Sequence, residues 1–197
     1  MSFDYLQKAR SSIEGASHRL ISKIEARDNA SIIARKIIKL CGEAISLTHR
    51  GRNAEARGKL NEAKLALSEI GVLMKDLGVD IFEVALQEYV EAESLLRIVE
   101  GRELPSIEEL QVTDEAYILG LADLIGELRR RVLEEIRKGD GLRAEELYQV
   151  MRDLYEILWP LEYPRSLVPG LRSKIDAMRR VIDETLHDIT LMKLMRS

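Results

Sequence analysis

The sequence predicts an all-α fold, a single-domain bundle of six to seven helices over residues 1–197. The four prolines are Pro105, Pro160, Pro164 and Pro169, so the stretches 1–104 and 106–159 lack the strongest helix breaker. No strand-like alternation of apolar and polar residues stands out. Hydrophobic residues form 46% of the chain and charged residues 32%, a balance that supports a folded core and argues against disorder.

The first helical segment is expected to start at about Phe3 and to run toward Arg27. Apolar residues recur at helical spacing beyond it, as far as Leu47. Asp28 lies between the two apolar patterns, and its side chain is of a type that caps helices. The sequence is therefore compatible with two helices that meet at Asp28 and with one long helix.

Glycines and capping residues set the later boundaries. Gly51 and Gly78 can end helices, while Asn53 and Asp80 can cap the helices that follow them. Signals of the same kind recur in the second half of the chain, at Ser106, Thr113 and Asp140. The helices delimited in this way run over 53–76, 81–99, 114–138, 142–158 and 171–194, with one short turn after Pro105.

The net charge of −4 conceals a strong asymmetry along the chain. Residues 1–60 hold 12 Lys and Arg against 6 Asp and Glu, whereas residues 61–128 hold 4 against 16. The last third, residues 129–197, is nearly balanced, with 14 against 12. A basic surface and an acidic site on one molecule would suit an enzyme that holds a polyanion and cuts it with metal, although solvated helix faces explain the same composition.

Several classes of protein are disfavoured by what the sequence lacks. No apolar run of about 18 residues is present, so no membrane span is expected, and the first residues contain no apolar signal-peptide core. A single cysteine, Cys41, rules out an internal disulfide and suits a reducing interior. We therefore expect a cytoplasmic protein in which Cys41 is a core or interface residue.

Two pairs of acidic residues interrupt otherwise apolar helical segments. Asp123 and Glu127 are the charged residues of the run YILGLADLIGEL, and their spacing of four places them on one helix face. Glu88 and Glu91 lie three apart in the segment VALQEYVEA. Acids on helices that must bury most of their surface are costly unless something compensates them. Four such carboxylates from two adjacent helices could hold a hard cation, Mg²⁺ or Mn²⁺, whose waters can serve as nucleophiles.

The same four acids are also compatible with a site that holds no such cation. Ion pairs with arginines, or simple exposure to water, would account for them equally well. A helical di-iron site requires inward-facing Glu-x-x-His motifs from two helices, and the three histidines of this chain do not supply that pair. The sequence also lacks a Gly-rich phosphate loop and zinc-type Cys/His spacing, and nothing in it points to a Ser-His-Asp triad.

Clustered basic residues are candidates for contact with nucleic-acid phosphates. Three arginines follow the acidic helical segment directly, and further basic residues recur at helical spacing in the first third of the chain. A solvated helix face, with Glu134 and Glu135 as partners of the three arginines, fits the pattern equally well. The candidates are Arg19, Arg27, Lys36, Arg50, Arg129, Arg130 and Arg131.

Several of these segments together resemble the translin/Trax family. The run YILGLADLIGELRR before the Gly139-Asp140 turn closely resembles the hallmark segment of the family, and LRSKIDAMRRVIDETLHDITL resembles its C-terminal helix. EYVEA at 88–92 is similar to the Trax acidic motif, and ISLTHR at 45–50 to a Trax-type helix end. The resemblance spans nearly the whole chain, and the short length and missing loops favour a compact, prokaryotic, Trax-like member.

This resemblance implies a translin-like all-α fold that assembles into closed octameric shells around RNA or DNA. It also implies an endoribonuclease, because Trax carries the catalytic acids of the translin–Trax complex. Those acids fall on Glu88, Glu91, Asp123 and Glu127, and translin itself lacks the set. An obvious copy of the basic, aromatic RNA-binding segment of translin is missing here, so we expect self-assembly, with RNA held by other basic residues.

Three functions are compatible with the sequence. The first is a metal-dependent endoribonuclease that acts on RNA, expected to be single-stranded, inside a homo-octamer that does not bind membranes. The second is a non-catalytic oligomer that binds single-stranded RNA or DNA, as translin does. The third is a helical scaffold whose acids are structural. Incubation of labelled RNA with and without Mg²⁺ or Mn²⁺ distinguishes them.

Overall fold

Within the residues that it describes, 6–77 and 82–195, the computed structural model consists of seven helices. They are α1 (Gln7–His49), α2 (Asn53–Leu77), α3 (Glu83–Val99), α4 (Ile107–Leu110), α5 (Asp114–Lys138), α6 (Gly141–Leu158) and α7 (Leu171–Leu194). No strand occurs in these residues, so the all-α prediction is confirmed. Not one of the described helices combines the length and the apolar character needed to cross a lipid bilayer.

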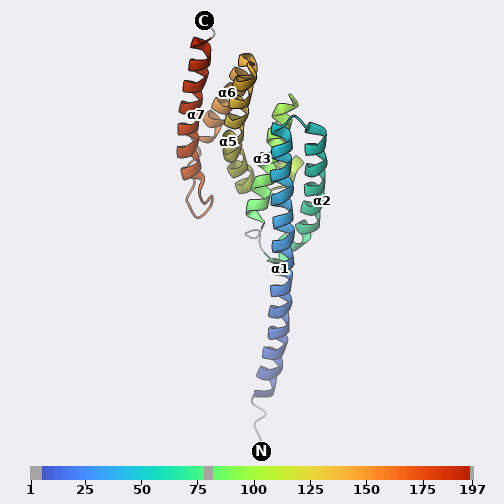
Figure 1. Cartoon of the computed structure of the whole chain (residues 1–197). Helices are drawn as coiled ribbons and strands as arrows, with labels where there is room; N and C mark the ends of the chain where they lie inside the picture. Colours follow the sequence, from blue (N-terminus) through green and yellow to red (C-terminus); the bar gives the residue numbers. More distant parts are fainter. Residues whose placement is uncertain (1–5, 78–81, 196–197) are drawn as a thin grey trace, which may run out of the picture.

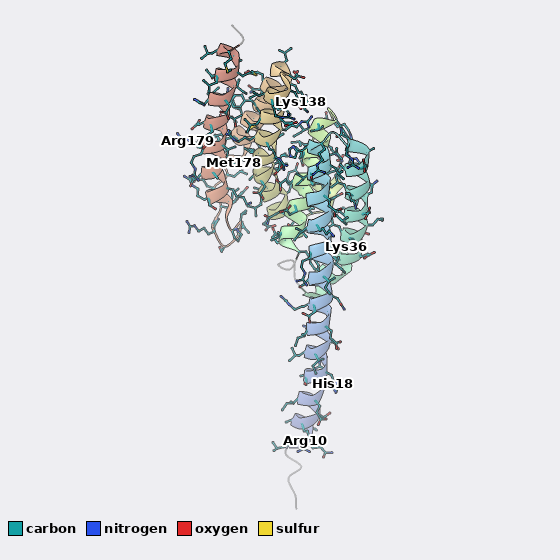
Figure 2. All side chains as sticks on the ribbon, in the orientation of Figure 1. Arg10, His18, Lys36, Lys138, Met178 and Arg179 are labelled. Atoms are coloured by element: carbon teal, nitrogen blue, oxygen red, sulfur yellow. The ribbon has the colours of Figure 1, made fainter. Side chains whose placement is uncertain are left out.

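The first helix is continuous, which resolves the alternative at Asp28 in favour of one long helix. Its first buried side chain is Ala30, and Figure 1 shows its N-terminal part extending away from all other helices. Figure 2 shows Arg10 and His18 on this part and Lys36 near the point where α1 joins the helical body. We call residues 7–29 the projecting part of α1. The predicted start at Phe3 lies outside the described residues.

The helical body has two groups of packed helices, α1 to α3 and α5 to α7, which the contact between α3 and α5 joins (Figure 1). One continuous core runs through both groups and is largely aliphatic, with Leu60, Leu96, Leu124 and Leu147 almost completely buried. Cys41 is buried in the same core, as expected from the sequence. The acidic segments of α3 and α5 therefore lie where the two groups meet.

The capping residues of the second half of the chain form the predicted hydrogen bonds. Ser106 accepts a hydrogen bond from the backbone N–H of Glu109, and Thr113 accepts one from Ala116. Asp140 caps α6 in the same way. These bonds satisfy backbone donors at the first turns, which fixes where each helix begins.

The expected cap at Asn53 is wrong. Asn53 is the first residue of α2, and its buried side-chain oxygen has no hydrogen-bond partner. The backbone carbonyl of Arg52 instead accepts from the N–H groups at the start of α2. The other predicted boundary signals of this region, Gly78, Asp80 and Ile81, lie outside the described residues.

Candidate functional site

The four predicted acids lie on two helices that approach each other very closely. A Cβ atom added at Gly120 of α5 would lie 2.7 Å from the backbone oxygen of Gln87 and 2.7 Å from Cβ of Val90, both on α3. Only glycine permits this separation, since real side chains do not tolerate such contacts. Gln87 and Val90 immediately precede Glu88 and Glu91. The close contact therefore holds the acidic face of α3 beside that of α5.

The four carboxylates interact electrostatically. Burial raises the pKa of Glu91 to about 8, and the negative charges of Asp123, Glu88 and Glu127 add to this effect. Burial also raises the pKa of Glu88, with Asp123 as the next contribution. Each acid of α3 is thus destabilised as a carboxylate by the acids of α5. The site carries more negative charge than its surroundings compensate.

Two cationic or potentially cationic side chains contact the acids of α5. Nζ of Lys174, on α7, donates to Oδ1 of Asp123 across 51 residues of sequence. Nε2 of His49, the last residue of α1, lies 2.5 Å from Oε2 of Glu127, and this contact lowers the pKa of Glu127. The site therefore draws side chains from α1, α3, α5 and α7.

Side chains one turn apart on α5 contact the end of α1 and hold it in place. Nη1 of Arg131 donates to the backbone oxygens of Thr48 and His49, at 3.4 and 3.2 Å. Its Nη2 lies 2.7 Å from Oε1 of the buried Glu135. Because Glu127, Arg131 and Glu135 are spaced by four, one face of α5 holds both the ring and the backbone of His49. The His49 side chain is only 7% exposed.

Sequence reasoning missed both His49 and Lys174 as members of the site. Lys174 interrupts the apolar face formed by Leu171, Ile175 and Met178. A lysine within an apolar helix face indicates a side chain that packs against the protein and has a partner there. His49 stood in the segment ISLTHR, but the sequence offered no sign that its ring would reach an acid 78 residues away. The one Glu-x-x-His pair of the chain, Glu184 and His187, is exposed on α7 and unsuited to an inward-facing metal site.

The donor set fits a hard cation, but the described side chains are not arranged as a finished metal site. No group of three or more His, Cys, Asp or Glu among the described residues is close enough together to hold a metal ion. Asp123 and Glu127 are instead engaged by Lys174 and His49. Carboxylate oxygens are the ligands that Mg²⁺ and Mn²⁺ prefer, and the raised pKa values on α3 show charge that a cation would relieve.

The predicted nucleic-acid contacts divide into two kinds. Arg129 is held by α7, at 3.1 Å from Asp188 and 2.9 Å from the hydroxyl of Thr185, and Arg131 is held by Glu135 and the end of α1. Arg130, between them, is 60% exposed and lies 3.6 Å from Glu127. Of the three arginines, Arg130 is therefore the one beside the site that can still turn to a phosphate.

The other predicted contacts lie on exposed surface. Arg19 and Arg27 belong to the projecting part of α1, Lys36 lies further along the same helix, and Arg50 follows its end. All four residues are exposed, so RNA binding at these positions stays a prediction.

Comparison with known proteins places the fold. The sequence model of the Translin family matches residues 25–185. The crystal structure of AfC3PO and the structure of an AfC3PO–duplex RNA complex each superpose with a TM-score of 0.88 at 31% identity, covering 94% of this chain and 98% of the other. The structure of apo-NeC3PO gives a TM-score of 0.80 at 24% identity and covers 98% of this chain and 99% of the other.

A sequence relative is also found in Methanocaldococcus jannaschii. It is an uncharacterised protein that is 44% identical over 104 residues, which are 52% of this chain. The matched segment covers 46% of that relative, so the chain spans less than half of its length.

Proposed function

Because the chain belongs to the translin family, we propose that it is a metal-dependent endoribonuclease of the Trax type. Glu88, Glu91, Asp123 and Glu127 would hold Mg²⁺ or Mn²⁺. The observation that supports this most strongly is that two closely packed helices bring four acids together, where burial raises the pKa of Glu91 to about 8 and the charges of the other three acids add to the rise. A partner of opposite charge lowers the pKa of an acid, whereas the pKa values of Glu88 and Glu91 are raised, and a bound cation would favour their charged forms.

The cation and the side chains around the acids would have different roles in cleavage. When bound, the cation would offset charge on the scissile phosphate and activate the attacking water. His49 fixes the orientation of Glu127 through its Nε2 contact. Arg130, which is exposed and next to Glu127, would contact a phosphate oxygen of the RNA.

RNA is the nucleic acid that we propose as substrate. AfC3PO, which resembles this chain at 31% identity, has been solved in complex with duplex RNA, so duplex RNA belongs in the test beside the single strands expected from the sequence. Helix α1, which bears several exposed basic residues, contains no Phe, Trp or Tyr on which a base could stack. Binding should therefore be largely independent of sequence and should weaken as salt rises.

A non-catalytic RNA-binding protein is the second candidate. The contacts of Asp123 with Lys174 and of Glu127 with His49 favour it, because they leave these acids engaged with the protein itself. Under this alternative RNA would bind with or without a divalent cation and would stay intact.

Cleavage of labelled single-stranded and duplex RNA, with Mn²⁺, Mg²⁺ or EDTA, tests the proposal. We expect cleavage that depends on the cation and is abolished in Asp123→Asn, with RNA affinity nearly unchanged. The control is Asp153→Asn on α6, an exposed acid that accepts a hydrogen bond from Gln149. A folded Asp123→Asn protein that cuts RNA at the wild-type rate would falsify the catalytic assignment.

We also propose that the chain assembles with itself, as an octamer on the family resemblance. The projecting part of α1 carries the exposed apolar residues Ile13, Leu20 and Ile24. The end of α7 adds Leu194 and Met195, which are 67% and 87% exposed. Apolar side chains in such numbers on a helix that extends away from the core are typical of an interface.

A further inference from the structure

Lys174 occupies an unusual position for a lysine. It lies in the first turn of α7 on the face that packs against the helical body, beside the buried Leu171 and Ile175. Its side chain is 29% exposed, and its ammonium group contacts Asp123 on α5. A partly exposed ion pair of this kind contributes only modestly to stability, so stability alone does not explain a lysine on an apolar helix face.

The charge of Lys174 acts on more than its direct partner. It opposes the rise in the pKa of both Glu88 and Glu91, while the neighbouring acids promote that rise. Among the described groups that shift the pKa of Glu91, Lys174 is the one that carries a positive charge. The ammonium group therefore has, in this structure, the electrostatic role that a bound cation would have.

A small groove adjoins the lysine. It has a volume of about 160 Å³ and lies between α5 and α7, with Asp123 and Lys174 among its lining residues. Ala122, Gly126 and Ala177 complete this part of the wall, and a Cβ atom at Gly126 would meet nothing within 4 Å. The lysine thus has free space beside it into which its flexible side chain can turn.

We propose that Lys174 is the resident counter-cation of the carboxylate site. It holds Asp123 while no divalent cation is bound, and it releases Asp123 to the cation and turns into the adjoining groove to contact a phosphate oxygen of the RNA. The inference rests on the proposed function. It makes two separate claims about one residue: Lys174 opposes the binding of the cation, and it assists the cutting of RNA.

Calorimetric titration of the protein with Mn²⁺ alone, at one fixed pH, tests the first claim. Lys174→Met should bind Mn²⁺ about tenfold more tightly than wild type, because Coulomb repulsion between neighbouring positive charges is of that order even when water screens it. Lys174→Gln should repeat the result, and Lys174→Arg should stay close to wild type. Lys193→Met is the matched control, because Lys193 lies on the same helix but pairs with Glu145 on the surface.

Thermal unfolding provides a readout that does not depend on activity. In EDTA, Lys174→Met should melt slightly below wild type, since Asp123 loses its partner. Saturating Mn²⁺ should raise the melting temperature of Lys174→Met by more than that of wild type, because tighter binding to the folded state gives greater stabilisation.

Cleavage of labelled RNA at saturating Mn²⁺ tests the second claim. Lys174→Met should cut at least about tenfold more slowly than wild type, because a contact to the reacting phosphate is lost. Unchanged or weaker Mn²⁺ binding in both neutral variants, or wild-type cleavage by them, would overturn the proposal. If wild type itself neither binds Mn²⁺ nor cuts RNA, the proposed function fails, which is a different result from a failure of Lys174 alone.

Discussion

The acids of this site differ in what surrounds each one. Glu127 is held by His49 and has a lowered pKa, whereas Glu91 is more deeply buried and has a pKa raised to about 8. The surroundings therefore shift the pKa values of two carboxylates of one site in opposite directions. Such divergence is typical of functional sites, because a purely structural network tends to pair every charge.

The raised pKa of Glu91 predicts a pH dependence of stability. Folding raises this pKa from 4.5 to about 8, so between these values the folded protein binds a proton that the unfolded chain does not. Stability should therefore fall as pH rises through this window. Urea unfolding in EDTA should show a smaller fall in Glu91→Gln, and the surface variant Glu146→Gln should keep the wild-type slope. A slope that is equal in all three proteins would contradict the assignment.

Arg131 and Arg137 offer a matched test of the contact between α1 and α5. Removal of the Arg131 side chain leaves the buried Glu135 without its main partner and should cost about 3 kcal/mol, as is usual when one member of a buried ion pair is lost. Arg137, which pairs with Glu134 on the surface of the same helix, should be nearly neutral. Chemical denaturation of Arg131→Leu and Arg137→Leu measures the difference. Equal midpoints would show that the fastening of His49 is unimportant for folding.

At the scale of elements, the contact between α3 and α5 sets the geometry of the site. Gly120 permits it, and an alanine there would bring Cβ to 2.7 Å from the backbone of α3. Gly120→Ala should therefore destabilise the protein by about 1 to 3 kcal/mol, since the helices must separate. It should also weaken Mn²⁺ binding, because Glu88 and Glu91 move away from Asp123.

Gly126 of the same helix is the control for helix propensity. It is exposed and has nothing near its Cβ position, so Gly126→Ala should stabilise the protein by about 0.5 to 1 kcal/mol. Thermal unfolding of the two variants with and without Mn²⁺ compares them. If Gly120→Ala behaves like Gly126→Ala, the two helices are not held at a limiting distance.

The sequence predicts local features of these elements much better than long-range ones. The caps at Thr113 and Asp140 are readable because the donor lies three residues from the acceptor. The long helix α1 was ambiguous because Asp28 suits both a cap and an exposed helical position. The acids on α3 and α5 could be proposed from spacing and family resemblance. The sequence marks Lys174 only as a lysine within an apolar helix face and does not reveal its partner. The contacts of Lys174 and His49 with these acids form only when distant segments pack.

At the scale of the whole molecule, the projecting part of α1 is unexpected for a protein that works as a monomer, because no other part of the described chain covers it. Its side chains lie largely outside the core, which begins at Ala30, and Figure 1 shows it separated from the rest of the bundle. An isolated helix of this length is marginal in water unless another surface covers it. Its exposed residues Ile13, Leu20 and Ile24 lie at spacings of seven and four, on one face.

The double variant Leu20→Glu/Ile24→Glu tests whether this face binds other copies of the chain. Each buried aliphatic side chain contributes about 1.5 to 3 kcal/mol to an interface, and two carboxylates there would be strongly unfavourable. Light scattering at micromolar concentration should give wild type about 180 kDa, the mass of eight chains of 22.4 kDa. The double variant should give a smaller species with unchanged helical content. Leu142→Glu, at an exposed position on α6, should assemble like wild type.

Two results would count against assembly through α1. A monomeric wild type would contradict the proposed assembly, and a double variant with the wild-type mass would contradict the role of α1 in it.

The smaller species formed by the double variant should also bind RNA differently. If the shell concentrates basic residues from several copies around one RNA, the smaller species should bind RNA more weakly and with a shallower salt dependence, because fewer phosphates are neutralised. The acids of each chain would be untouched, so Mn²⁺ binding per chain should persist while RNA cleavage falls.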